Sequence, residues 1–237
     1  HVQVAIHLLK KSCSIAAADK KGITSVMNAS RNGHVNTLSL LLRKTPPAQM
    51  RETINLEDSD GETALFKATL AGHLEALRAL LLWEADVDIS KPDGTTPLMV
   101  ACELGHTGVV RLLLQGKAEV NTQRECDGKT ALMLAVGSKW EKCARVLLLS
   151  PSVDVFLQSH SGETVLMMAR RGGGGKGMEG VVKLLQNSRT VLYQSMQHTP
   201  LSSETVQAWL AGRLPESVKS SMPPFNRPRP CGVVGGG

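Results

Sequence analysis

The sequence predicts an all-α solenoid, in which short helix-turn-helix units follow one another along the chain and stack side by side. One observation is a set of five glycines spaced by 39, 33, 34 and 34 residues, each with the same kinds of neighbours. The other is composition: hydrophobic residues make up 42% of the chain and aromatic residues only 3%, which favours Leu- and Ala-rich helices over a β-sandwich. A unit of this length cannot bury its own apolar face, so neighbouring units must cover it.

The repeat is defined by residues at fixed distances from these glycines. A threonine stands two residues after each glycine, Val or Leu stands four residues after it, and alanine stands seven residues after it. Agreement at three positions in five units indicates a true repeat. The glycines are Gly22, Gly61, Gly94, Gly128 and Gly162, and the threonines are Thr24, Thr63, Thr96, Thr130 and Thr164.

Each unit is expected to contain a turn, a short helix, a second turn and a longer helix. Dipeptides such as Asp60-Gly61 favour tight turns, and the threonine that follows can cap the first helix. The Gly-His pairs that begin at Gly33, Gly72 and Gly105 suit a left-handed helix end. Leucine-rich stretches come next and predict a second helix that the neighbouring unit buries.

Residues 93–106, Asp-Gly-Thr-Thr-Pro-Leu-Met-Val-Ala-Cys-Glu-Leu-Gly-His, resemble the signature of the ankyrin repeat family. The resemblance covers roughly residues 1–186 and implies an ankyrin repeat solenoid. It also implies a protein or peptide partner, bound without a cofactor in a concave groove of turn tips and first-helix faces. Because such repeats serve very many proteins, the resemblance specifies the fold far better than the function.

The expected organisation is a repeat domain over 1–186, a helical cap over 187–214 and a disordered Pro/Gly-rich tail over 215–237. His1 aligns with the histidine of a Gly-His pair, so we expect the chain to begin halfway through a repeat, as a fragment of a longer protein, with a helix over 1–9. The complete repeats are expected near 19–57, 58–90, 91–124, 125–158 and 159–186.

Several residues depart from the family pattern. The glycine that usually precedes the closing Ala is Glu84 in the second unit and Lys117 in the third, and a left-handed backbone there costs about 1 kcal/mol each. Insertions around Thr45-Pro46-Pro47 and over 172–177 are expected to be surface loops. His34, His73 and His106 recur at one repeat position and are expected to hydrogen-bond between turns.

Composition excludes several function classes. The net charge is +6, but residues 19–186 hold 20 Lys and Arg against 19 Asp and Glu, which argues against a nucleic-acid-binding face. No apolar run approaches the roughly 18 residues of a membrane span. The five cysteines are odd in number, widely spaced and lack a CxxC motif, which fits a reducing compartment: the cytoplasm, with the nucleus as the alternative.

No residue pattern supports catalysis, a cofactor, a metal or a small-molecule substrate. Gly175-Lys176 suggests a phosphate-binding loop, but Arg170 and Gly177 occupy positions where the motif requires Gly and Ser or Thr. Histidines in successive repeats lie about 10 Å apart and do not converge on a metal. The cysteines have no evident neighbouring base. A monomeric, non-catalytic protein is expected.

The candidate partner-binding residues flank each anchor glycine or lie at the end of a first helix. Leu70 and Leu104 stand out because folding does not obviously need an apolar residue there, although both could simply cover adjacent helices. Asn121, eight residues after Leu113, resembles asparagines that a dioxygenase hydroxylates in this family; the alternative is an ordinary hairpin residue. The full set is Lys20, Lys21, Arg31, Asn32, Ser59, Asp60, Glu62, Leu70, Asp93, Thr95, Glu103, Leu104, Lys129 and Trp140.

Two hypotheses for function follow. The first is a protein-binding scaffold. The second is a targeting or regulatory module of a larger enzyme, channel or ubiquitin-ligase adaptor, which the half-repeat at His1 makes plausible.

Overall fold

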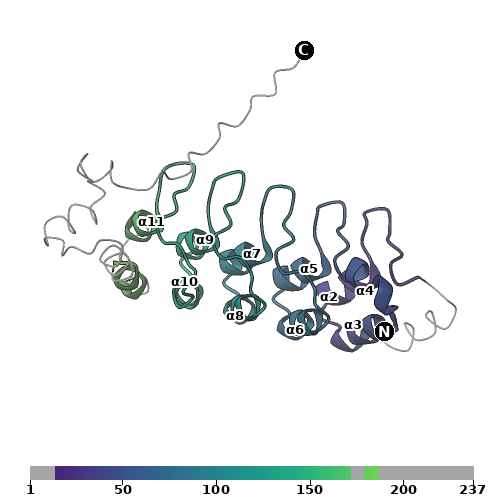
Figure 1. Cartoon of the computed structure of the whole chain (residues 1–237). Helices are drawn as coiled ribbons and strands as arrows, with labels where there is room; N and C mark the ends of the chain where they lie inside the picture. The colour runs from purple at the N-terminus through teal and green to yellow at the C-terminus, as the bar shows by residue number, and fades with distance from the viewer. Residues whose placement is uncertain (1–13, 172–178, 187–237) are drawn as a thin grey trace, which may run out of the picture. The chain divides into compact units, whose positions relative to one another are not determined.

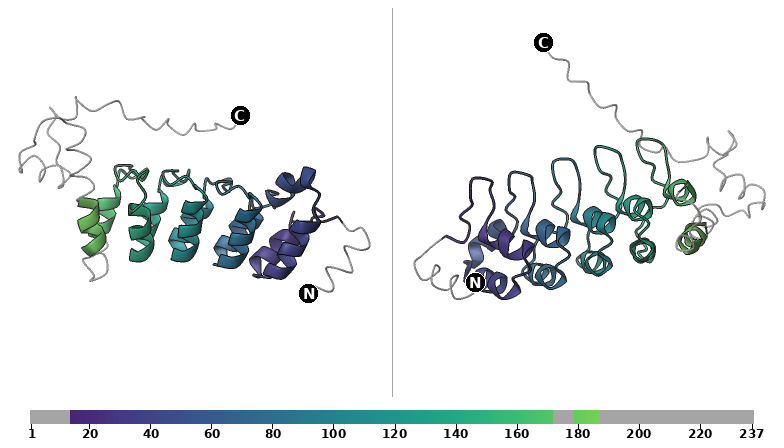
Figure 2. Two further views of the ribbon diagram at one scale, coloured as in Figure 1. Left: turned by 60° about the horizontal axis from the view of Figure 1, so that its bottom comes forward. Right: turned by 180° about the vertical axis from the view of Figure 1, so that it is seen from behind.

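A computed structural model of the chain describes residues 14–171 and 179–186. All regular elements within these residues are α-helices, which confirms the all-α solenoid (Figure 1). They form two layers that stand side by side, as further views show (Figure 2). The inner layer consists of α2 (Ser25–Arg31), α5 (Ala64–Leu70), α7 (Pro97–Leu104), α9 (Ala131–Gly137) and α11 (Val165–Arg171). The outer layer consists of α3 (Val35–Lys44), α6 (Leu74–Leu82), α8 (Thr107–Gln115), α10 (Glu141–Leu148) and a helix over 179–186.

The inner helices begin where the repeated threonines predict. The Thr63 hydroxyl accepts a hydrogen bond from the Phe66 N–H at 3.2 Å, and the Thr96 hydroxyl accepts one from the Met99 N–H at 3.3 Å. Each bond satisfies an N–H group that has no partner within the helix. A Gly-His pair ends α2, α5 and α7, and Gly105 caps α7 with a φ of 78°, in the left-handed region.

The core lies between the two layers. The repeated alanines Ala68, Ala101 and Ala135 are all 0% exposed, so they lie in this core. The leucines of the outer helices complete the core, and among them Leu77 and Leu113 are 0% exposed. Each repeat therefore depends on its neighbours for burial, as in other solenoids.

One expected surface loop is a helix instead. The insertion around Thr45-Pro46-Pro47 continues into α4 (Pro47–Ile54), so the loop prediction is wrong there. Pro47 takes the first helical position, where its missing N–H has no effect, and Ile54 at the far end is 1% exposed. Burial of one helix face thus outweighs the turn preference of the two prolines. The helix predicted over 1–9, the insertion over 172–177, the cap over 187–214 and the tail over 215–237 lie outside the described residues.

The left-handed backbone expected at the closing turns is confirmed. Glu84 has a φ of 59° and Lys117 a φ of 65°. Lys139 also has a positive φ, 63°, at the position that holds glycine in the Gly-His pairs. These three side chains are exposed, so the strain arises from backbone and Cβ and not from packing.

Replacing a strained residue by glycine is expected to stabilise the fold. Lys117→Gly removes the Cβ clash of the left-handed conformation and should raise the free energy of unfolding by about 0.5–1 kcal/mol, measured by urea denaturation. Lys142→Gly, at an exposed position inside α10, is the matched control and should lower it by about 1 kcal/mol. A loss of stability in both variants would contradict the strain assigned to Lys117.

Candidate protein-binding surface

Five hairpin turns, here called the hairpin tips, project from the inner layer around Gly22, Gly61, Gly94, Gly128 and Gly162 (Figure 1). An acidic side chain closes the first two tips from within. Asp19 Oδ1 accepts hydrogen bonds from the N–H groups of Lys21 and Ile23 at 2.8 and 2.9 Å. Asp58 Oδ1 does the same for Asp60 and Glu62 at 3.0 and 2.9 Å. Such bonds hold the turn backbone in one conformation.

Backbone hydrogen bonds also join neighbouring tips. The Ser59 N–H donates to the Lys21 carbonyl at 2.9 Å, and the Glu125 N–H donates to the Asp93 carbonyl at 3.1 Å. The His160 N–H donates to the Asp127 carbonyl at 2.9 Å. At the junction of the second and third tips Pro92 takes the place of the donor and packs against Gly61, and no backbone hydrogen bond joins the described residues of these two tips. The tips together with the exposed C-terminal ends of the inner helices are called the tip surface below.

A further set of bridges lies nearer the closing turns. The Asp88 carboxylate accepts from the Glu119 N–H at 2.9 Å, and the Asn121 side-chain oxygen accepts from the Asp154 N–H at 2.8 Å. The Asn121 amide nitrogen donates to the Ser152 carbonyl at 2.7 Å. Both ends of the Asn121 amide thus join adjacent repeats, which favours the ordinary structural interpretation of this residue. Its hydroxylation stays a prediction.

A buried ion cluster lies beneath the second tip. The Lys67 ammonium group is 2.5 Å from an Asp58 carboxylate oxygen and 2.9 Å from Glu62, and the side chains of Lys67 and Asp58 are 5% and 2% exposed. Lys91 lies 3.8 Å from Glu62 and 6.0 Å from the centre of the Phe66 ring. The positive charges of Lys67 and Lys91 are therefore balanced by the carboxylates of Asp58 and Glu62.

The cluster shifts the pKa of its members. Burial alone would raise the pKa of Asp58, but hydrogen bonds from Lys67 and from the N–H groups of Glu62 and Asp60 outweigh burial and hold it below the ordinary value. Burial alone would lower the pKa of Lys67, but its hydrogen bonds to Asp58 and Glu62 raise it. Both groups are therefore charged at neutral pH.

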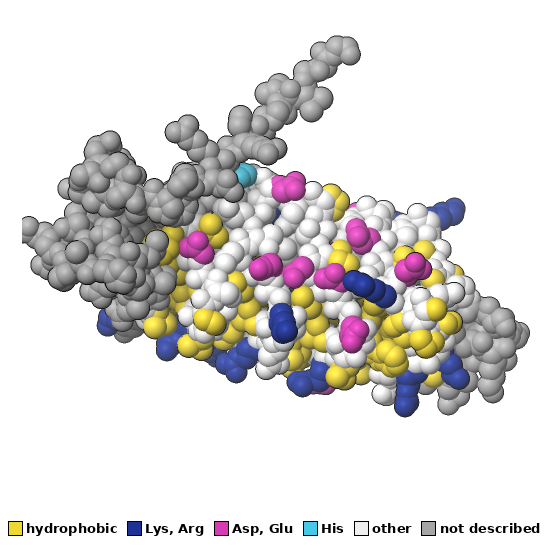
Figure 3. Space-filling model, in the orientation of Figure 1, with side chains coloured by type: hydrophobic (Ala, Val, Ile, Leu, Met, Phe, Trp, Pro, Cys, Tyr) yellow, Lys and Arg dark blue, Asp and Glu magenta, His cyan; other side chains and the backbone are white. Residues whose placement is uncertain are grey.

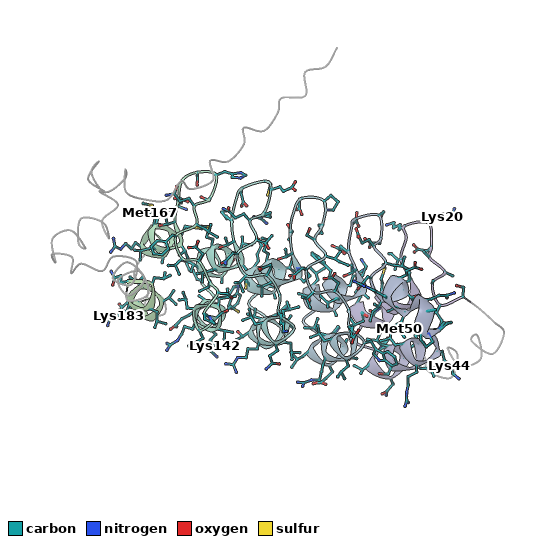
Figure 4. The ribbon with its side chains drawn as sticks, in the orientation of Figure 1. Lys20, Lys44, Met50, Lys142, Met167 and Lys183 are labelled. Atoms are coloured by element: carbon teal, nitrogen blue, oxygen red, sulfur yellow. The ribbon has the colours of Figure 1, made fainter. Side chains whose placement is uncertain are left out.

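Most of the predicted partner-binding residues reach solvent. The exposed residues at the tips are Lys20, Lys21, Ser59, Asp60 and Asp93, and those at the ends of inner helices are Arg31, Asn32, Leu70, Glu103 and Leu104. Lys20 lies at the first tip (Figure 4). Met167 of α11 is 43% exposed but does not belong to the tip surface. It stands five residues after Gly162, and the residues at this position in the earlier repeats, Met27, Phe66, Met99 and Met133, are each 1% exposed.

Three predicted residues are placed differently. Thr95 is only 6% exposed, contrary to the expectation of an accessible contact residue: its N–H bonds to Asp93 and its carbonyl accepts from Lys91, which folds it into the hairpin. Glu62 is half-buried and is held by Lys67 and Lys91. Lys129 is half-buried and lies 3.1 Å from Asp127. These side chains stabilise hairpins and are poorly available to a partner.

Leu70 and Leu104 are each 43% exposed but do not occupy equivalent positions. Leu70 follows Gly61 by nine residues, whereas Leu104 follows Gly94 by ten. The difference rotates one side chain by about 100° relative to the other, because a helix turns once in 3.6 residues. The residue of the third repeat that is equivalent to Leu70 is therefore Glu103, and the two leucines do not form one row.

Trp140 stands where three other repeats have the histidine of a Gly-His pair. His73 packs against Gly33, His106 against Gly72, and the Trp140 ring against Gly105, where an added Cβ would lie 2.4 Å from a ring atom. The Trp140 indole N–H also donates to the Glu103 carbonyl at 2.9 Å. Ring packing on glycine is thus the contact that the structure shows at this position.

Sequence reasoning missed Asp58, Lys67 and Lys91 as a group. The sequence does contain a sign of this cluster. Lys67 stands six residues after Gly61, a position where the next three repeats have the apolar residues Val100, Leu134 and Met168. A lysine at a buried apolar position requires an acidic partner. The sequence does not reveal which acid it is, because Asp58, Asp60 and Glu62 all lie in the hairpin that precedes Lys67.

The described residues contain no group of three or more His, Cys, Asp or Glu side chains placed to hold a metal ion. Within the same stretches of chain, no helix has the length and hydropathy required to cross a membrane.

The sequence matches a family model described as ankyrin repeats in three copies, over residues 1–93 and 79–159. The chain belongs to the ankyrin repeat family. No match was found among curated proteins. Ankyrin repeats are generally protein-protein interaction modules, and the family is typically non-catalytic. In this ankyrin repeat chain the tip surface is the ordered, solvent-facing part of the inner layer.

Proposed function

We propose that the tip surface binds a partner protein or peptide without covalent chemistry or a cofactor, and that this binding is the function of the chain. The observation that carries the proposal is the exposed apolar pair Leu104 and Trp140, which are 43% and 45% exposed. The indole is fixed by its hydrogen bond to Glu103, and Leu104 lies between Glu103 and Gly105, the two residues that the indole contacts. A fixed aromatic residue next to an exposed leucine is the composition of an interface centre.

The order of the tips supports the same proposal. Because backbone hydrogen bonds join three of the four pairs of neighbouring tips, and Pro92 packs against Gly61 at the fourth junction, a partner meets a backbone that needs little rearrangement, and binding loses little conformational entropy. Loops that are held in one conformation by a helical scaffold are well suited to recognition.

Charge along the tip surface indicates what the partner carries. The first repeat presents exposed Lys20, Lys21 and Arg31, whereas the second and third present exposed Asp60, Asp93 and Glu103. We infer a partner with acidic residues facing the first repeat, and with apolar and basic residues facing the second and third.

The remaining expectations belong to this proposal. We infer that the chain acts as a monomer in the cytoplasm or the nucleus. Cys102, Cys126 and Cys143 are free thiols, which suits a reducing compartment. Analytical ultracentrifugation of the full chain tests the monomer.

Serine at both Leu70 and Leu104 is expected to weaken partner capture more than tenfold, equivalent to about 1.4 kcal/mol, because an exposed apolar contact is lost. The measurement is affinity capture with the full chain, followed by quantitative mass spectrometry. Helical content should be unchanged, since both side chains are 43% exposed.

The matched control is serine at Leu82 and Leu149, which are 78% and 82% exposed on the outer layer. It should leave capture of the same partners unchanged. Capture that depends on the outer pair and not on Leu70 and Leu104 would contradict the proposed function.

A further inference from the structure

A row of basic side chains crosses the outer layer. Arg78 in α6, Arg111 in α8, Arg145 in α10 and Lys183 in the last described helix are all exposed. Each stands two residues before a leucine that is 0% exposed: Leu80, Leu113, Leu147 and Leu185. The four basic residues therefore occupy one repeat position and point away from the core. They are called the basic row.

An apolar row runs parallel to it. Leu82 and Leu149 stand four residues after Arg78 and Arg145, so each lies one helical turn further along the same face. They are 78% and 82% exposed, more than any other large apolar side chain described. Gln115 holds this position in α8. Side chains so exposed contribute nothing to the core.

The outer layer is basic as a whole. Its helices carry seven Lys or Arg residues against three acidic ones. Basic side chains gather along the lower edge of the molecule, whereas acidic ones spread over the face above it (Figure 3). Lys44, Lys142 and Lys183 project from that edge (Figure 4). The basic residues are Arg43, Lys44, Arg78, Arg111, Lys142, Arg145 and Lys183, and the acidic ones are Glu75, Glu141 and Glu179.

The basic row is available to a ligand. Arg78 lies 3.7 Å from Glu75 and Arg145 lies 3.2 Å from Glu141, but these are pairs within one helix whose arginines are more than half exposed. Ion pairs of this kind are weak and are easily exchanged. Arg111 forms no ion pair among the described residues.

The distance between neighbouring residues of the basic row indicates whether a helix or an extended strand would fit it. Neighbouring packed helices lie about 10 Å apart. An α-helix rises 1.5 Å per residue, so about seven residues, close to two full turns, span one repeat and return to the same face. An extended strand spans one repeat in about three residues, and alternate residues of a strand face opposite sides, so successive repeats would meet opposite faces.

We propose that the outer layer binds an acidic amphipathic helix, laid across α6, α8, α10 and the helix over 179–186. Its carboxylates, one in every seven residues, face Arg78, Arg111, Arg145 and Lys183, and its apolar side chains cover Leu82 and Leu149. A flat anionic membrane fits less well, because it would also meet Glu75, Glu141 and Glu179. The ligand differs in charge pattern from the one inferred for the tip surface, and the inference does not depend on that proposal.

The probe is a fluorescent 28-residue helical peptide with Glu at every seventh position and Leu on the adjoining stripe, titrated with the full chain and followed by anisotropy. Reversal of Arg78, Arg111 and Arg145 to Glu is expected to weaken binding more than tenfold. Serine at Leu82 and Leu149 should weaken it at least threefold. A peptide with Lys in place of Glu should not bind.

The matched control reverses three basic residues of the tip surface, Lys20→Glu, Lys21→Glu and Arg31→Glu, with the same change in net charge. It should alter the affinity less than twofold. If both triple variants weaken peptide binding equally, the effect comes from the overall charge of the chain and the proposal is overturned. Binding to phosphatidylserine vesicles without binding to the peptide would overturn it in favour of a membrane. Serine at Leu70 and Leu104 should leave peptide binding unchanged, so failure here is distinguishable from failure at the tip surface.

Discussion

Gly105→Ala is expected to lower the free energy of unfolding by about 3 kcal/mol, whereas Gly162→Ala should lower it by about 1 kcal/mol. Both glycines have a left-handed backbone, with φ of 78° and 76°, so both substitutions add the same backbone strain. They differ in their surroundings: a Cβ at Gly105 would lie 2.4 Å from the Trp140 ring, and one at Gly162 would meet nothing within 4 Å. The larger loss therefore measures ring packing between repeats.

Trp140→Ala provides the test of that cause. In its background the cost of Gly105→Ala should fall to about 1 kcal/mol, because only backbone strain remains. Urea denaturation followed by circular dichroism measures all four variants. If Gly105→Ala costs the same with and without the indole, contact with the Trp140 ring is not the cause of the larger loss.

Asp58→Ala is expected to lower the free energy of unfolding by about 3–5 kcal/mol, because it removes one partner of a buried ion pair and leaves Lys67 inadequately compensated. The substitution also removes the acceptor for the N–H groups of Asp60 and Glu62. The double variant Asp58→Asn with Lys67→Met keeps the shape and removes both charges, so it should cost markedly less than Asp58→Ala.

The pH dependence of the Asp58 effect has a defined sign. The pKa of Asp58 is lower in the folded chain, so its stabilisation is present above its ordinary pKa of 3.8 and is lost as the pH falls through the folded value. The pKa of Lys67 is higher in the folded chain, so its stabilisation is full below 10.5 and is lost as the pH rises through the folded value. The difference between wild type and Asp58→Ala should therefore be constant near neutral pH and shrink in acid. A constant difference down to the lowest pH would contradict the ion pair.

The sequence alone determined the repeat and its local structure. Thr63 and Thr96 cap the inner helices, Gly105 ends one of them, and Ala101 is fully buried, all as the repeat predicts. These features depend on residues a few positions apart, and their recurrence in successive units makes each one recognisable. The strain at Lys117 followed in the same way, because a known turn demands a positive φ whichever residue occupies it. Most tip residues were also placed in solvent correctly, since turn positions rarely reach a core.

Only the tertiary structure decided how adjacent repeats meet. Thr95 looked like a contact residue, but its hairpin and the neighbouring hairpins bury it. Prolines suggested a loop where α4 forms, because the burial of Ile54 is a long-range gain that local turn preference does not include. The Trp140 ring on Gly105 and the two hydrogen bonds of the Asn121 amide depend on which side chains face one another across a junction. The Asp58–Lys67 pair depends on how a hairpin packs against the helix that follows it. The spacing of the repeated residues shows where each repeat begins. It does not show which way each side chain points in the folded solenoid, and contacts between repeats depend on that direction.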